Sequence, residues 1–486
     1  MGYTELVKHM RYKSMYRQNE LYWGLGIEEE TYLQFTKPIY VASPILKTCH
    51  AAERYSVKYY STFYPTYKDD FAAYFTQDFY PLPYFVNSHV FTRMDTSGNH
   101  MTTYERAPKP NPKFNGKTFF DLLEEHVPTG CLGSLGCLGT LSCLSCPSKK
   151  RFIDVFNETC IFDGDTIEFM TQNFYKSNVR SVIKELVTSK AEFLESINSY
   201  LIATKTHRDK GLLMYPPVNP GFAIFYSNPK NVTMFNNGTY HINITLPTLL
   251  GKRDANGTPV ILDLKKFRET HRKFIRLIQW MEPFMIAVFG TKDPLSEVNP
   301  KYSKGSQRCA VSRYIGIGTY DTQAMPTGKI VTMPVEDIRG SQTDFWWYNT
   351  YHADSAYVPL KELGMDICYR KHYNHGVEIR FLDWFPEERL KGLIEFYLCL
   401  ADASLHGSMP AEPVMSKAWN DFVVSVLKEG QDAIVPADMI IALSRLFGEW
   451  CLTDFPPPQT VKEVYEVLAR NLGKMFKDGI CNKLMR

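Results

Sequence analysis

Leu25-Gly26-Ile27-Glu28-Glu29-Glu30-Thr31-Tyr32-Leu33 places three consecutive carboxylates inside a segment with the pattern of a β-strand. Side chains alternate between the two faces of a strand, so Glu28 and Glu30 share one face and Glu29 points to the other. The two carboxylates that share a face lie about 7 Å apart and repel each other unless a cation is near. Two interpretations follow: a strand face in contact with water, or a site for a divalent cation with oxygen ligands.

Two other segments show the same alternation, with one polar and one apolar face. The polar face carries His241 and Asn243 in one segment, and Glu378 and Arg380 in the other. Carboxylates with one imidazole suit Mg²⁺ or Mn²⁺ better than a zinc site built on thiolates, and guanidinium groups suit phosphate. The three strands therefore predict a cradle for a nucleotide and a metal, although the sequence contains no G-x-x-x-x-G-K-[ST] phosphate loop.

The hydrophobic periodicity predicts the elements around these strands and an α+β fold, in which a mainly antiparallel sheet packs under helices. We expect one catalytic domain over residues 1–400, with elaborations at about 48–150, and a C-terminal helical region over 401–486 packed on it. The expected strands are 22–35, 239–247 and 376–383, and the main expected helices are 173–199, 262–289, 390–405, 415–428, 437–447 and 461–476.

Length and composition exclude several classes of protein. A chain of 486 residues can bury a substantial core, and 44% hydrophobic residues with 22% charged residues argue against disorder. A net charge of +3, with no basic run longer than Lys149-Lys150-Arg151, gives no support for binding to nucleic acid. No segment has the roughly 18 apolar residues of a membrane span, and the N-terminus lacks a signal-peptide core. We therefore expect a cytoplasmic protein without nucleic-acid or membrane partners.

The cysteines form one unusual patch. Of eleven in the chain, four lie in the Gly-rich segment 130–147, where Cys143 and Cys146 have C-x-x-C spacing. Cys131 and Cys137 would complete four thiolates around zinc. The wide spacing and the lack of polar neighbours favour a flexible loop with reduced thiols instead.

Five short motifs, taken in order along residues 26–383, resemble those of the glutamine synthetase and glutamate-cysteine ligase superfamily of ATP-dependent carboxylate-amine ligases. Each lies on the type of element that this superfamily uses. The motifs are Gly26-Ile27-Glu28-Glu29-Glu30 (G-x-E-x-E), Glu168-Phe169-Met170-Thr171 (E-F-x-T), His241-Ile242-Asn243 (H-x-N), Arg308 with Arg313 (R-x4-R) and Glu378-Ile379-Arg380 (E-x-R).

This resemblance implies a curved half-barrel sheet of the glutamine synthetase type and a ligase that depends on ATP and Mg²⁺ or Mn²⁺. It implies that a carboxylate, that of glutamate, is activated as an acyl phosphate and attacked by an amine such as cysteine. The implied metal ligands are Glu28, His241 and Glu378 around one ion and Glu30 and Glu168 around a second. The implied phosphate-binding catalytic residues are Arg308, Arg313 and Arg380, with Glu28, Asn243, Arg308 and Arg313 contacting the nucleotide.

Alternatives remain open at this stage. The same scaffold serves Pup ligase and deamidase, which act on a protein side chain, and a chain that kept the fold without activity would be a binding scaffold. Arg380 is alternatively a structural partner of Glu378 or Asp383, His241 a buried histidine without a metal, and Glu168 a charge at a strand end. Loops at 209–232 and 290–310 are expected to close over the site, because an acyl phosphate must be kept from water.

Overall fold

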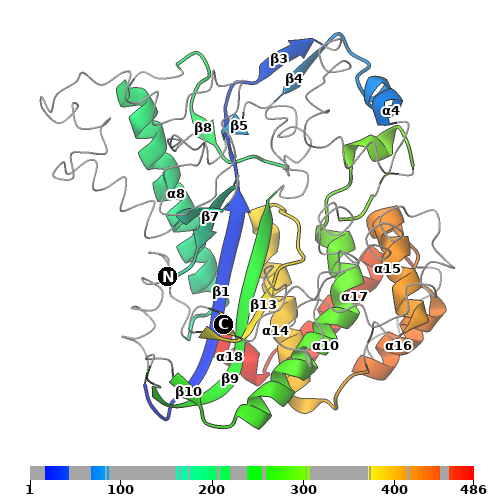
Figure 1. Ribbon diagram of the computed structural model, residues 1–486. Helices are drawn as coiled ribbons and strands as arrows, with labels where there is room; N and C mark the ends of the chain where they lie inside the picture. Colours follow the sequence, from blue (N-terminus) through cyan, green and yellow to red (C-terminus); the bar gives the residue numbers. More distant parts are fainter. Residues whose placement is uncertain are drawn as a thin grey trace, which may run out of the picture. The chain divides into compact units, whose positions relative to one another are not determined.

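Figure 1 shows the computed structural model of the chain. Arg308, Arg313 and the cysteine-rich segment 130–147 lie outside the residues whose structure is described. The described residues are 17–42, 67–82, 85–86, 160–163, 166–172, 176–204, 208–218, 238–253, 255, 259–300, 302, 304–306, 370–371, 374–411, 413, 416–448 and 459–486.

The chain divides into two compact units, and the first strand, β1 (Leu21–Thr31), passes from one into the other. The division falls between Ile27 and Glu28, so this strand contributes to both units. Unit 1 comprises Met1–Met10, Glu28–Gln172 and Lys184–Gly238, and unit 2 comprises Arg11–Ile27, Asn173–Ile183 and Thr239–Arg486.

The longest strand of unit 2 is β9 (Thr239–Arg253). It pairs antiparallel with β10 (Pro259–Ile261) and β13 (Val377–Ile379), and it neighbours β1 in the strand order β10-β9-β1 (Figure 1). Just before β1 begins, the backbone N–H of Asn19 donates to the carbonyl of Leu250 at 2.8 Å. The residues of β9 from Thr239 to Leu246 are buried on both faces, so the polar face of this part of the strand is not in water.

Helices make up most of the rest of unit 2. In chain order, the first of these helices packs against the second, the third and the fifth, and the second also packs against the last. The first is apolar and almost continuously buried through its second half, which explains its central place in the packing. These helices are α10 (Leu264–Phe289), α14 (Leu390–His406), α15 (Lys417–Glu429), α16 (Ala437–Phe447), α17 (Val461–Met475) and α18 (Ile480–Met485).

The compact units do not coincide with the expected division at residue 400. Helix α14 runs through that position without a break and packs against α10, α17 and α18. Its residues from Leu393 to Ala401 are almost all buried. The helices on either side therefore share one core, and the C-terminal helices belong to the same unit as β9 and β13.

Helix α17 begins with a capping box that provides a simple test of the fold. The Thr460 hydroxyl accepts the backbone N–H of Glu463 at 3.3 Å, and the Glu463 carboxylate accepts the backbone N–H of Thr460 at 2.9 Å. The backbone N–H of Thr460, together with its hydroxyl, which donates to the same carboxylate oxygen at 2.9 Å, lowers the pKa of Glu463. The contribution of the box is therefore present at neutral pH and is lost as the pH falls through that lowered pKa.

Thr460→Ala is expected to lower the free energy of unfolding by about 1 kcal/mol, because one backbone donor of the first turn loses its acceptor. Denaturant unfolding measures this loss. The matched control is Thr270→Ala, whose hydroxyl donates to the Lys266 carbonyl one turn back in α10, and this change is expected to stay within about 0.5 kcal/mol. Equal losses in both variants would contradict a capping role for Thr460.

Unit 1 continues the sheet from the second part of β1. There β1 pairs antiparallel with β7 (Thr166–Met170), which pairs antiparallel with β6 (Cys160–Asp163). The long helix α8 (Val179–Thr204) supplies further core residues. The smaller elements are β2 (Leu33–Phe35) with β5 (Phe85–Val86) and β8 (Leu213–Met214), β3 (Ile39–Ala42) with β4 (Phe79–Leu82), and α4 (Tyr67–Tyr74).

The fold is thus α+β, with an open antiparallel sheet and helices, as the sequence predicted. A short hairpin of β11 (Arg370–Lys371) and β12 (Asn374–His375) precedes β13. Within the described ranges, none of the helices combines the length and the apolar character needed to cross a bilayer.

Candidate metal centre

The burial of the opening triplet excludes one of its two interpretations, a strand face in contact with water. Glu28 is 2% exposed and Glu30 is 3% exposed, so their face of β1 is not in contact with water. Glu29, on the other face, is completely buried. Buried carboxylates are costly unless cations or hydrogen-bond donors compensate their charge. The positive partners of each carboxylate therefore define what this region can do.

Glu29 has its cation within the protein. The ammonium group of Lys190, on α8, lies 2.8 and 3.0 Å from the two carboxylate oxygens of Glu29. Tyr215 encloses the pair, because its ring lies 4.8 Å from the Lys190 nitrogen and its hydroxyl donates to the Lys190 carbonyl. On this face of β1, Glu29 therefore forms a structural ion pair. We expect it to take no part in the chemistry.

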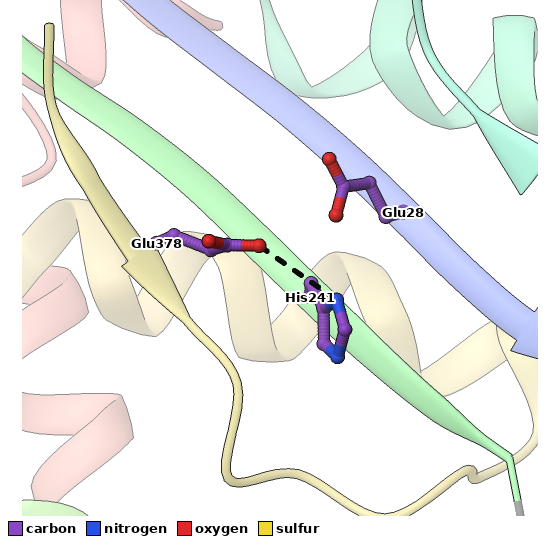
Figure 2. Close-up of side chains that lie close together, drawn as sticks. All are labelled: Glu28, His241 and Glu378. Atoms are coloured by element: carbon purple, nitrogen blue, oxygen red, sulfur yellow. Dashed lines mark ion pairs between the residues drawn. The ribbon is translucent and has the colours of Figure 1, made fainter. Parts of the chain in front are cut away.

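On the opposite face, Glu28, His241 and Glu378 come together from β1, β9 and β13. Each offers one ligand atom, and these three atoms all lie within 4.8 Å of one another. Figure 2 shows the two carboxylates turned toward each other and toward the imidazole. Ligands on opposite sides of a bound Mg²⁺ or Ca²⁺ lie about 4 to 5 Å apart, so one ion can reach all three atoms.

Glu378 has two described polar contacts within or beside the cluster. An oxygen of Glu378 lies 3.7 Å from His241 Nδ1 and accepts a hydrogen bond from Arg380 at 3.0 Å. All three cluster residues are at most 3% exposed. Two carboxylates held close together at this depth favour a cation beside them.

A second pair of carboxylates lies in unit 1. Glu30 and Glu168 are directly opposite each other in the register of β1 and β7, and they are 3% and 8% exposed. Opposite residues of an antiparallel pair project to the same face with their Cβ atoms about 5 Å apart, and like charges in this arrangement are destabilising. This arrangement has the residue types of a second oxygen-ligand site, and the pair belongs to the same motifs that the sequence singled out.

Two other predicted residues lie beside the cluster. Asn243 is opposite Glu378 in the register of β9 and β13, so it shares the face of the cluster. Arg380 forms the ion pair with Glu378 that was one of its two alternative structural interpretations. The other alternative was a pair with Asp383. The described partners of Asp383 are the backbone N–H of Thr291 and the hydroxyl of Ser306. Arg308 and Arg313 lie outside the described residues.

The comparison with known proteins gives one strong match. The chain is 36% identical over 485 residues to the uncharacterized protein R704 of Acanthamoeba polyphaga mimivirus, a match that covers 98% of this chain and 79% of R704. The chain belongs to the R704 family. No model of a protein family matches the sequence. The name of the viral relative states no activity, so a function for the R704 family has to be argued from the site.

The structure also shows buried polar residues of this R704-family chain that the sequence analysis did not select. Arg276, Gln279 and Glu282 are at most 3% exposed and follow one another at three-residue spacing on α10, where Arg276 donates to Gln279 at 3.0 Å. Glu282 and Tyr465 contribute, after burial itself, to raising the pKa of Tyr397 well above its ordinary value. The three-residue spacing of polar side chains within an apolar helix was the available signal for this stripe.

Two cysteines of the C-terminal helices are structural. Cys399 and Cys481 are free thiols and are buried. Burial raises the pKa of Cys399 to about 11 and also raises that of Cys481. Burial therefore favours the thiol form of both at neutral pH and disfavours the thiolate, which is the nucleophilic form.

Proposed function

We propose that this chain is an ATP- and Mg²⁺- or Mn²⁺-dependent carboxylate-amine ligase, similar to glutamate-cysteine ligases and built on a glutamine synthetase-like sheet. One observation carries the proposal. Glu28, His241 and Glu378 come from three motifs separated by more than a hundred residues each, and their ligand atoms lie within 4.8 Å of one another in a buried position. If the motif matches were accidental, there would be no reason for these three ligand atoms to lie close together in the fold.

The residue types fit the metal that the resemblance implies. Two carboxylates and one imidazole are suitable ligands for Mg²⁺ or Mn²⁺, whereas thiolates are absent from the cluster. Glu28, His241 and Glu378 would hold one ion, and Glu30 with Glu168 a second. Bound ions at these places would neutralise the phosphate oxygens of ATP during transfer.

The protein's own groups have separate tasks in the proposed reaction. ATP phosphorylates the substrate carboxylate, an amine attacks the acyl phosphate, and the products are an amide, ADP and phosphate. Arg380 is oriented by its bond to Glu378 and is only 15% exposed, so its guanidinium would bind phosphate oxygens in a shielded position. The burial of the cluster keeps bulk water from the acyl phosphate, whose hydrolysis would waste ATP.

The proposal is tested by the release of ADP from Mg²⁺-ATP in the presence of glutamate and a panel of amines that includes cysteine. We expect ADP release that requires both glutamate and one of the amines, with one amide formed for each ADP. Calorimetry with an ATP analogue and Mn²⁺ runs in parallel.

Three other outcomes would contradict the small-molecule ligase. Nucleotide binding without ADP production would identify a scaffold. A silent amine panel, with modification of a protein side chain, would favour the activity of the Pup ligase and deamidase type. The absence of both binding and turnover would reject the nucleotide site itself.

A further inference from the structure

Asp383 is a buried carboxylate that none of the motifs includes. It is 1% exposed and lies in the segment that continues from β13. One of its oxygens accepts the backbone N–H of Thr291 at 2.6 Å, and the other accepts the hydroxyl of Ser306 at 3.0 Å. A single side chain thus holds both ends of the segment 291–306. A carboxylate with two donors at these distances is a strong and directional anchor.

The described part of the segment 290–306 makes further close contacts within unit 2. The backbone N–H groups of Lys304 and Gly305 both donate to the carbonyl of Leu427. Gly290 packs so closely against Ser306 that a Cβ at Gly290 would lie 3.0 Å from the Ser306 Cα. The segment 290–310 was expected to be a closing loop. Its described residues form a packed connection, which makes them suitable for positioning a side chain, and closure over the site stays a prediction.

The stretch that ends at Asp383 also leads to the candidate metal centre. Asp383 follows Arg380 by three residues, and the carbonyl of Leu382 accepts a hydrogen bond from the hydroxyl of Thr239. Thr239 is the first residue of β9 and precedes His241 by two residues. The short stretch 380–383 is therefore bonded to the strand that carries the imidazole and to the segment that ends at Ser306.

The sequence places Arg308 two residues after Ser306. Arg308 and Arg380 are both expected to bind phosphate from their motifs. Of the two, Arg380 lies among the described residues, three positions before the carboxylate that binds Thr291 and Ser306.

We infer that Asp383 is a positioning residue for Arg380, because its bonds to Thr291 and Ser306 fix the stretch that carries Arg380 within unit 2. The inference rests on the proposed function, since it assigns a role within the same nucleotide site. Asp383 itself does not contact phosphate in this scheme. It acts through the hydroxyl of Ser306 and the backbone of Thr291.

The test compares Asp383→Asn and Ser306→Ala with the control Asp293→Asn. Asp293 is also 1% exposed and also accepts a backbone N–H in the same segment, that of Leu295 at 2.9 Å, but this bond stays within the segment. The affinity for Mn²⁺-ATP is measured by calorimetry, KM and kcat for ATP are measured by ADP release, and thermal unfolding checks that each variant is folded.

Asp383→Asn is expected to weaken ATP binding by about tenfold or more, and Ser306→Ala by about threefold, with a matching rise in KM for ATP. Asp293→Asn should keep ATP affinity within about twofold although it also loses stability. Unchanged ATP affinity in folded Ser306→Ala and Asp383→Asn would overturn the inference. Equal loss in Asp293→Asn would do the same, since Asp383 would then be structural only. A wild-type protein that binds no ATP would refute the proposed function together with the inference.

Discussion

Glu28→Gln is expected to lower the rate of ADP release by about a hundredfold or more while the protein stays folded. The amide has the shape of the carboxylate but lacks its charge, so the buried cluster with His241 and Glu378 loses one anionic ligand. The substitution removes one of the two carboxylate charges of the cluster, and the attraction for a divalent cation falls accordingly. Glu378→Gln is expected to have the same effect and also to loosen Arg380.

Metal binding gives a readout of the same variant that is independent of turnover. A ligand that binds the folded state alone raises its stability, so Mn²⁺ should raise the thermal unfolding temperature of the wild-type protein. This rise should be strongly reduced in Glu28→Gln. The matched control is Glu297→Gln, which removes a half-exposed carboxylate paired with Lys292 at the surface, and here both turnover and the response to Mn²⁺ should remain. Full activity in Glu28→Gln would reject the metal assignment.

Glu29→Ala is expected to have the largest effect on stability, a loss of about 3 to 5 kcal/mol in the free energy of unfolding. The substitution leaves the ammonium of Lys190 at 9% exposure without the carboxylate that compensates it. Urea unfolding measures the change. Removal of both charges in the double variant Glu29→Gln with Lys190→Met should recover most of the loss, because no uncompensated charge then remains buried.

A surface ion pair is the control for this argument. Lys417 and Asp421 are one helical turn apart, their charged groups lie 2.6 Å from each other, and their side chains are 67% and 39% exposed. Lys417→Met should change stability by about 0.5 kcal/mol or less. At a temperature where Glu29→Ala is folded, it should retain the ADP release of the wild type, since Glu29 faces away from the cluster. A loss of turnover as large as that of Glu28→Gln would contradict the division of the two faces of β1.

Local sequence determined most of the helices. The expected helix 437–447 coincides with α16, and 390–405 differs from α14 by one residue at its end. Helical periodicity and end signals act over a few neighbouring residues, so they can be read from the sequence. The expected helix 173–199 begins earlier than α8, which starts at Val179 after Asn178 accepts the N–H of Ser181.

Strand limits depended more on distant partners. The expected strand 239–247 was ended at Pro247, yet β9 continues to Arg253 because β10 and the two residues just before β1, Asn19 and Glu20, bond to its second half. The expected strand 22–35 is divided at Tyr32 into β1 and β2. The division coincides with a change of partner, from β7 for β1 to β5 and β8 for β2.

The alternation of Glu28, Glu29 and Glu30 between two faces was determined by the sequence alone, because it follows from the geometry of a single strand. Only the tertiary structure decided whether those faces are exposed to solvent or buried. Lys190 lies 161 residues from Glu29, and His241 and Glu378 reach Glu28 from strands still further along the chain. Burial and charge compensation depend on these long-range neighbours, which no local pattern contains. A pattern that was ambiguous as a sequence is therefore, in the folded chain, an ion pair on one face and a candidate metal centre on the other.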